Sequence, residues 1–587
     1  MNKSLLPLNS CCSNKALKPA CPALVLGLLL GACSDAGPTP DPVAVACSSS
    51  STSITVIQGE GYQSPLLDSL QTVRGTVTYV SDSGFYIEGS DLPADGRYSR
   101  ALFISDDALS RSVQPGQQLQ VSGRVSELGK ARDKLTSLID ISSHEICAEQ
   151  VALPLTRVEL PMDPAAREAL EGMRVAFAQT LTVSDVYKLA DGELSLSSKG
   201  VPRVPTEVTM PGPSARILEK ENRNHILVAI LPASGSAIPI GSSTHEAAGL
   251  MGHDGRKQQL ILDATPTFSL PASPALKPAA KGSIRIVNSN LLNFFNGDGK
   301  GGGFPTERGA ESPDEFIAQS ARTRAAMERI QPDLLAVQEL ENDGFGPDSA
   351  AQALLALLND TGFDDWAFIA PGPGVIGGDV ITVGLFYRQS VLEAVGMPRV
   401  LDEPEFRGLS RQPLAQLFRE PISGSTFLVA VHHLKSKGSC PDNGENANQD
   451  DGQGCWNPAR VAAVKAQTPW LGRLAEEMGT DLTLILGDMN AWRNEDPIRQ
   501  FVDSGYIDLV AEISGLPQHS FLYWGQTGTL DYAFASPALA KYARYAANWH
   551  INADWPGGMN QAQPWLRASD HDPVIVDFEF SQSATSD

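Results

Sequence analysis

Apolar and polar positions follow two different patterns in the two halves of this chain. From about residue 50 to 148, short runs alternate apolar and polar residues between Gly and Asp turns, as at 71–80, 84–88, 100–104 and 118–125. Successive side chains of a strand point to opposite faces of a sheet, so this alternation predicts half-buried strands. The first region is therefore predicted to be a small barrel or sandwich.

The C-terminal half has largely apolar runs instead, at 283–287, 333–337, 426–431 and 482–486. Runs of this kind predict strands that are buried on both faces. Helical stretches at 318–330, 351–359 and 459–478 lie between them. Strands that alternate with helices predict an α/β domain in which helices cover the sheets.

The chain of 587 residues is longer than one hydrophobic core normally supports, so two or three domains are expected. A further set of β-like runs at 149–270 predicts a second β-rich module, or an elaboration of the first. The Pro/Ala-rich stretch 271–281 predicts a linker. The expected order is a leader at 1–33, a tether at 34–46, β regions at 47–148 and 149–270, the linker, an α/β domain at 282–580 and a disordered tail at 581–587.

Polar residues collect where the predicted strands of the C-terminal half end. Asp488 and Asn490 lie two positions apart after an apolar run, so both side chains leave the same face. Ends of buried strands are the places where α/β folds hold their chemistry. The other strand-end residues are Asn290, Glu339, His433, Asp531, Asp570 and His571.

The order of these residues resembles that of the endonuclease/exonuclease/phosphatase superfamily, to which DNase I-like nucleases belong. The resemblance is carried by Asn-Leu-Leu-Asn-Phe-Phe (290–295), Val-Gln-Glu-Leu-Glu-Asn (337–342), His-His-Leu-Lys-Ser-Lys-Gly (432–438), Gly-Asp-Met-Asn (487–490), Leu-Asp-Tyr (530–532) and Ser-Asp-His-Asp-Pro-Val (569–574). It covers residues 282–580, and within the family the chain is similar to large extracellular bacterial nucleases. The fold implied is a four-layer α/β sandwich, here preceded by a β-rich region that resembles an OB-fold.

The resemblance implies a metal-assisted phosphodiester hydrolase. Glu339 would bind Mg²⁺ or Mn²⁺, helped by the amide oxygen of Asn290 and by Asp570, because hard cations prefer oxygen ligands. His571, oriented by Asp531 or Asp570, would activate the attacking water as general base. Asp488 and Asn490 would position that water, the phosphate or a second cation.

Further residues receive roles from the same resemblance. His433 would bind the phosphate or protonate the leaving oxygen, and Asp379 would orient it. Arg411 would hold a phosphate oxygen through two hydrogen bonds. Lys435 would contact substrate, and with Lys437, Arg411 and Arg460 it would form a local basic patch. His432 stands where the family commonly has Asn, which leaves that detail of the phosphate site open.

The N-terminus predicts export. Three lysines precede a short apolar run at 23–30, which ends in Leu-Gly-Ala-Cys (30–33). This resembles a bacterial lipobox, so Cys33 is expected to carry lipid and anchor the protein at the outer membrane. The alternative is ordinary cleavage nearby and release of an extracellular protein.

Four cysteines remain after the leader, an even number that fits disulfides in an oxidising compartment. Three pairings are open, of which Cys440 with Cys455 would close a polar loop and Cys47 with Cys147 would join the ends of the first domain. The acidic residues of that loop, Asp442, Asp450 and Asp451, are candidates for structural Ca²⁺, against the alternative of a solvated loop.

The formal charge of −23 argues against a general polyanion-binding surface. A nuclease of this charge needs metal ions and a local basic patch to approach phosphates. The expected function is hydrolysis of extracellular DNA, or RNA as well, with nucleic acid as the partner and no obligate protein partner. The alternative is a phosphoesterase of the same fold that acts on phospholipid or small phosphoesters.

Overall fold

The computed structural model describes residue 47 and residues 50–90, 97–130, 134–233, 235, 237–372, 374–558 and 562–580. The predicted leader with Cys33, the tether and the tail at 581–587 lie outside these residues. None of the helices in the described ranges combines the length and apolar character needed to cross a bilayer.

The first region is a closed barrel of five strands in the order β1-β2-β3-β5-β4. Its elements are α1 (Ile54–Gln58), β1 (Leu70–Ser81), β2 (Gly84–Glu88), β3 (Ala101–Ile104), α2 (Asp107–Ser110), β4 (Gln118–Leu128) and β5 (Leu135–Ala148). The predicted short strands are therefore present, and they close on themselves.

Alternating apolar residues of these strands fill the barrel. Val73, Phe85 and Leu119 are fully buried and belong to one apolar cluster. Cys47 pairs with Cys147, so a disulfide joins the two ends of the region. The likeness of the barrel to an OB-fold stays a prediction.

The second module is one sheet of eight strands in the order β11-β8-β9-β10-β13-β12-β7-β6. Its strands are β6 (Thr156–Val158), β7 (Arg174–Phe177), β8 (Leu181–Asp185), β9 (Glu193–Ser197), β10 (Ile226–Ile230), β11 (Ser243–Thr244), β12 (Ala247–His253) and β13 (Gln258–Leu262). Its helices are α3 (Pro164–Glu168), η1 (Leu189–Asp191), α4 (Pro205–Val208) and α5 (Pro213–His225).

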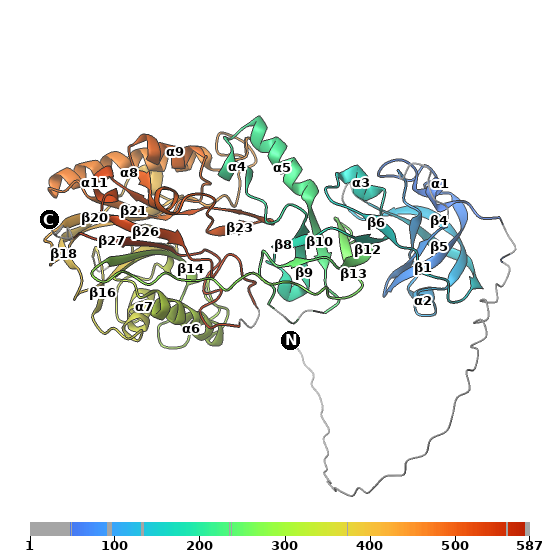
Figure 1. Ribbon diagram of the computed structural model, residues 1–587, viewed down its shortest axis with the longest axis horizontal. Coiled ribbons are helices and arrows are strands. Elements are labelled where there is room, and N and C mark those ends of the chain that lie inside the picture. Colours follow the sequence, from blue (N-terminus) through green and yellow to red (C-terminus); the bar gives the residue numbers. More distant parts are fainter. Residues whose placement is uncertain are drawn as a thin grey trace, which may run out of the picture. The chain divides into compact units, whose positions relative to one another are not determined.

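The C-terminal part, for which the sequence predicted a domain at 282–580, has two six-stranded sheets packed face to face. The first sheet has the order β16-β17-β15-β14-β27-β26 and the second β18-β19-β20-β21-β25-β22. In Figure 1, α8 and α9 cover one outer side and α6 and α7 the other. Apolar side chains of both sheets, among them Ile286, Val429 and Leu486, form the core between them. The four-layer α/β sandwich predicted from the sequence is confirmed.

The bounds of this domain's elements follow the predicted runs closely. The first sheet and its helices are β14 (Ile284–Phe294), α6 (Pro313–Ile330), β15 (Leu334–Glu341), α7 (Ala350–Asn359), β16 (Trp366–Phe368), β17 (Ile381–Arg388), β26 (Ala543–Asn548) and β27 (Val574–Phe578). The second sheet and its helices are β18 (Glu393–Val400), η2 (Pro404–Phe406), β19 (Arg411–Arg419), β20 (Thr426–His433), α8 (Asn457–Glu477), β21 (Thr483–Asp488), α9 (Asp496–Asp503), β22 (Ile507–Asp508), α10 (Leu509–Ser514), β25 (Asp531–Ala535) and α11 (Pro537–Ala540). A separate hairpin is formed by β23 (Phe521–Tyr523) and β24 (Gln526–Gly528).

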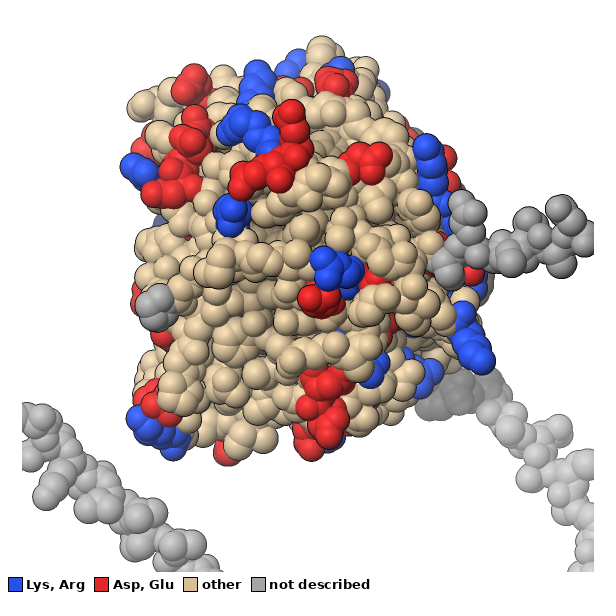
Figure 2. Space-filling model, turned by 90° about the vertical axis from the view of Figure 1, so that its left-hand side faces the viewer, with Lys and Arg blue, Asp and Glu red and all other residues tan. Residues whose placement is uncertain are grey.

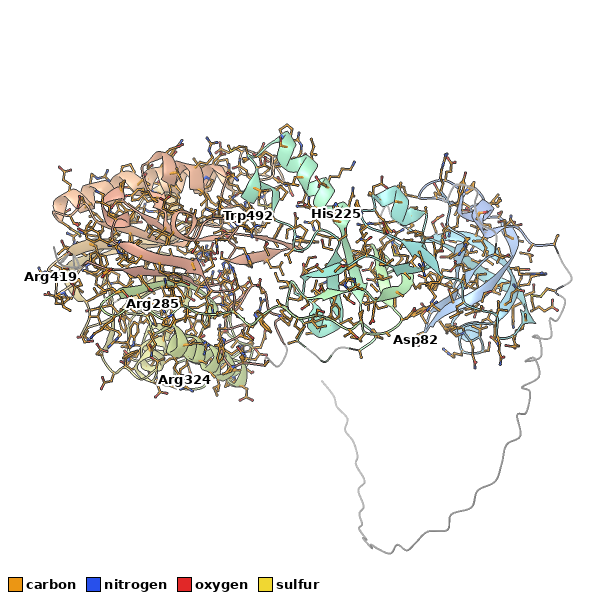
Figure 3. All side chains as sticks on the ribbon, in the orientation of Figure 1. Asp82, His225, Arg285, Arg324, Arg419 and Trp492 are labelled. Carbon is orange, nitrogen blue, oxygen red and sulfur yellow. A yellow bond between two sulfur atoms is a disulfide. The ribbon has the colours of Figure 1, made fainter. Side chains whose placement is uncertain are left out.

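A buried ion pair ties the linker to the first sheet. Arg285 of β14 donates to both carboxylate oxygens of Asp577 in β27, at 2.7 and 2.8 Å. The same guanidinium, labelled in Figure 3, donates to the carbonyl of Lys277 in the linker. Because a buried charge is costly unless it is paired and hydrogen-bonded, this arrangement fixes the linker where the domain begins.

The α4–α5 segment of the second module packs on the C-terminal domain, and residues from Ala44 onward form one compact unit. Glu207 of α4 is buried and accepts hydrogen bonds from Thr529 N at 3.1 Å and Arg493 Nε at 3.2 Å. Val204 shares an apolar cluster with Trp492, which Figure 3 labels. These contacts join the second module to the C-terminal domain.

Candidate active site

Four polar side chains of the second sheet lie in one row across adjacent strands. The strand register pairs Arg411 with His433, His433 with Asp488, and Asp488 with Asp531. The row is possible because β20 and β21 are parallel and end together, while β19 and β25 are antiparallel and begin there. All four side chains are buried, so they form a fixed polar edge.

The first sheet contributes side chains to the site at positions where its regular strand pairing is interrupted. The register shifts between Asn290 and Phe294 in β14 and between Val337 and Leu340 in β15. Glu339, inside the second break, has a φ of 61°, in the left-handed region that non-glycine residues seldom adopt. Strained backbone of this kind gathers at functional sites, where it aims a side chain.

Asn290 connects the two sheets. Its Nδ2 lies 3.3 Å from Glu339 Oε1 and 3.3 Å from Asp488 Oδ2. Its Oδ1 accepts a hydrogen bond from Leu292 N at 2.9 Å. The amide nitrogen, and not the oxygen, therefore faces the carboxylates, which differs from the expectation that the oxygen would bind metal. The interaction with the Leu292 N–H holds the amide in this orientation.

His571 forms the most tightly defined contact of the site. Its Nδ1 lies 2.7 Å from Asp531 Oδ2, which also accepts a hydrogen bond from Ser520 Oγ at 2.7 Å. Burial acts to lower the pKa of His571, but Asp531 and then Asp488 outweigh it and raise that pKa well above its usual value. Of the two candidates for orienting His571, the structure pairs Asp531 with it.

His433 has the opposite electrostatic environment. Its Nε2 lies 3.4 Å from Asp488 Oδ2, while the Nε2 of His571 lies 4.0 Å from the same oxygen. Burial, and then Arg411, lower the pKa of His433. Burial acts to raise the pKa of Asp488, but His571 and His433 hold it at about 2. The two imidazoles therefore flank one carboxylate and differ in their affinity for a proton.

Asn490 is held beside Asp488 by local contacts. Its backbone N–H donates to Asp488 Oδ1 at 2.9 Å, and its Nδ2 lies 3.2 Å from both Asp488 Oδ2 and Leu434 O. Its φ of 47° is also left-handed. The predicted shared face of the two side chains thus arises through a tight turn after β21.

The expected role of Asp379 requires a correction. Asp379 Oδ2 lies 3.2 Å from Arg411 Nε, and its Oδ1 lies 3.6 Å from Arg308 Nη1. Asp379 therefore orients Arg411 and not His433, because the two guanidinium groups attract its carboxylate. Arg411 also donates to the carbonyl of Leu434 at 3.3 Å.

The predicted basic patch is smaller than expected. Lys437 donates to Gln453 O at 2.6 Å and pairs with the buried Glu495, and Arg460 is fully buried and donates to Lys435 O. These two cations therefore support the fold. Lys435 is half-buried, and its Nζ donates to Ser436 Oγ and to the carbonyls of Ser436 and Gly438.

Asp570 is half-buried and lies next to His571 in the chain, with Ser569 Oγ 3.5 Å from its Oδ1. The Cys440–Cys455 disulfide closes the acidic loop as anticipated. In that loop Asp451 accepts two hydrogen bonds from Gln453, at 2.9 Å each. Structural Ca²⁺ at this loop stays a prediction.

Ser520 and Phe521 were not predicted from the sequence. Ser520 fixes Asp531, and the ring centroids of Phe521 and His571 are 4.6 Å apart. Neither belongs to a motif. Their place gave the one sequence signal, since Ser520 lies just before and Phe521 begins a short strand whose turn leads to Asp531.

The donor set of the site fits a divalent cation. Asp488, Asp531 and His571 offer ligand atoms within 4.8 Å of one another, and the half-buried Glu339 adds a carboxylate. Asp531 Oδ1 is buried and has no hydrogen-bond partner among the described residues. Several carboxylate oxygens gathered in one place are the environment that a hard divalent ion requires.

Residues 290–571 match the model of the Endonuclease/Exonuclease/phosphatase family. No curated protein matches the chain. Among solved structures, the human nocturnin catalytic domain is 18% identical, with 52% of this chain and 97% of that chain covered and a TM-score of 0.34. A mannosyl-6-phosphatase of Bacteroides thetaiotaomicron is 15% identical, with 50% and 98% covered and a TM-score of 0.34.

A third similar structure is D. rerio TDP2 with a single-strand DNA product, 12% identical, with 51% and 99% covered and a TM-score of 0.33. The family comprises divalent-metal-dependent hydrolases of phosphoester bonds, and the geometry of the site agrees with that chemistry. The match over residues 290–571 confirms the resemblance to the endonuclease/exonuclease/phosphatase family that the sequence motifs of the C-terminal half predicted.

Proposed function

We propose that this chain is a metal-dependent nuclease that hydrolyses phosphodiester bonds in DNA, and in RNA as well. The observation that carries the proposal is the pair of buried imidazoles, His433 and His571, on either side of Asp488. Hydrolysis of a diester needs one group to take a proton from water and others to hold the phosphate. The two imidazoles differ in proton affinity, as these separate tasks require.

His571 acts as the general base in this proposal. Asp531 orients its ring through Nδ1, so Nε2 is left to take a proton from water. Its raised pKa makes it a strong base once it is neutral. The lowered pKa of His433 leaves that ring neutral near pH 7, so we assign it to phosphate binding rather than to protonation of the leaving oxygen.

Charge favours a diester over a monoester. Arg411 is the cation that lies in the row of polar side chains, and Asp379 already compensates it in part. A phosphodiester brings one negative charge and a monoester close to two. The carboxylates of this acidic site therefore repel a diester less strongly than a monoester. A bound Mg²⁺ or Mn²⁺ would polarise the phosphoryl oxygen and offset charge that develops during attack. Glu339 and Asp488 would hold it.

A nucleic acid is supported by an aromatic hairpin beside the site. Phe521 of β23 contacts His571, and the hairpin tip carries Tyr523 and Trp524, which are 44% and 67% exposed. Exposed aromatic rings provide stacking surfaces for unpaired bases. The same exposed rings would also suit insertion into a lipid surface, which keeps phospholipid as the second candidate substrate.

The location proposed for the enzyme is outside the cell or on the outer membrane, attached through Cys33. The sequence of the leader and the two disulfides support it. On the face shown in Figure 2, basic and acidic side chains are interspersed on a largely uncharged surface. Because the formal charge of the chain is −23, contact with a polyanion in this proposal depends on the metal and on Arg411 more than on long-range attraction.

The test is nicking of supercoiled plasmid by the purified chain with Mg²⁺ or Mn²⁺, with chelator, and with the His571→Ala variant. Metal-dependent open circles that disappear in the variant are expected. Parallel assays with RNA, sphingomyelin vesicles and a phosphomonoester separate the alternatives. Intact plasmid and RNA beside hydrolysed lipid would replace the nuclease proposal with the phospholipid one.

A further inference from the structure

We infer a second metal site, separate from the catalytic carboxylates, formed by His519, His550 and Asp554. These residues offer ligand atoms within 4.8 Å of one another. His519 Nε2 lies 2.8 Å from Asp554 Oδ1, close enough for both atoms to bind one ion. The two imidazole rings lie face to face, with centroids 4.0 Å apart, so one ring has to rotate for both nitrogens to reach the same ion.

A buried carboxylate behind His550 is the second observation. His550 Nδ1 lies 2.9 Å from Asp572 Oδ2, and the Asp572 side chain is fully buried. Its other oxygen accepts from the backbone N–H groups of Asn552 and Ala553. Histidines that bind metal usually donate their second ring N–H to a fixed carboxylate, which leaves the other nitrogen for the ion. In His550 that other nitrogen is Nε2.

The ligand set selects the kind of ion. Two imidazoles and one carboxylate suit a borderline ion such as Zn²⁺ better than Mg²⁺, which prefers oxygen. The side chains of His519, Asp554 and His550 are 16%, 22% and 31% exposed, so an ion can enter from solvent and a water can complete its shell.

An ion at this site would help to hold the catalytic residues in place, because the ligands are their neighbours in the chain. His519 precedes Ser520, which fixes Asp531, and Asp572 follows His571. An ion held here would join the 519–520 segment to the 550–554 segment. Its expected effect is a higher melting temperature and a firmer placement of His571.

The test uses the full chain, freed of metal with chelator and titrated with Zn²⁺ against a chromophoric chelator, and with Co²⁺ followed by absorption. A Glu339→Gln background removes a ligand of the catalytic site. We expect tight Zn²⁺ binding in that background, with one equivalent that becomes weaker by about 100-fold or more after His519→Ala with His550→Ala. His144→Ala, an exposed histidine of the barrel, is the matched control and should bind as the parent does.

Asp554→Asn, which keeps the shape of the side chain, serves if the double variant does not fold by circular dichroism. Loss of tight binding and of the Zn²⁺-induced rise in melting temperature is again expected. The inference is overturned if the Glu339→Gln parent binds no Zn²⁺ or Co²⁺, or if Asp554→Asn binds as tightly as the parent. Neither outcome depends on the substrate of the enzyme.

Discussion

The two sheets of the C-terminal domain deliver their functional side chains in different ways. The second sheet uses regular pairing, since Arg411, His433, Asp488 and Asp531 follow from the register of four strands. The first sheet uses interruptions, and Glu339 reaches the site from a left-handed residue inside a break of β15. The row in the second sheet, here called the regular edge, is thus assigned phosphate binding and the orientation of the general base His571. The interrupted strand ends of the first sheet, here called the irregular edge, supply the main metal ligand.

The largest effect is expected from His571→Ala. Loss of the general base should lower kcat by about 10²–10⁴-fold, with a smaller change in KM. Single-turnover cleavage of a labelled oligonucleotide measures this directly. If the variant retains more than roughly a tenth of the parent rate, His571 is not the general base.

Glu339→Gln tests the irregular edge, with an expected loss of about 10²–10³-fold at limiting metal. The amide keeps the size of the side chain but lacks the charge, so excess Mg²⁺ or Mn²⁺ should recover part of the rate. Metal titrations of activity measure the shift. An equal loss at every metal concentration would argue that Glu339 does not bind the ion.

Asp531→Asn tests the regular edge through pH. A base must be neutral, so activity should fall as pH drops through the raised pKa of His571. Removal of the Asp531 charge lowers that pKa, and the acidic limb of the kcat/KM profile should move down by about one pH unit or more.

The opposite assignment gives an opposite profile. If His571 donated a proton, activity would fall on the alkaline side, and the substitution would bring that limb to lower pH. The pH profiles of the parent and Asp531→Asn therefore separate the two roles.

The smallest effect is expected from Asp379→Asn, which leaves Arg411 in place but weakens its orientation. KM should rise by about tenfold, equivalent to ~1.4 kcal/mol, with little change in kcat. Asp402→Asn, whose carboxylate pairs with the exposed Arg407, is a matched control for loss of a surface ion pair. Equal effects of the two substitutions on KM would show that Asp379 has no role in the site.

The regular edge could be predicted from sequence because strand ends with polar residues align when the strands pair. At the irregular edge the pattern placed Glu339 at a strand end, but nothing in Val-Gln-Glu-Leu-Glu marks this residue as left-handed, and its role as a metal ligand came from the resemblance. The partner of Asp379 and the burial of Lys437 depend on contacts between distant segments. The role of Ser520 could not be predicted from the sequence either, because it arises only when the segment of Ser520 packs against β25.

Glu207 of the second module makes contacts that the C-terminal domain needs. The family match begins at residue 290, but Arg493 and Thr529 are satisfied by a carboxylate that lies before the linker. Excision at the linker would remove one of the two carboxylates that pair with Arg493, since Asp508 would remain, and would leave the Thr529 N–H without its acceptor. The stability of the C-terminal domain therefore depends on the second module. A fragment that starts at 282 should be expressed less well than one that keeps the second module.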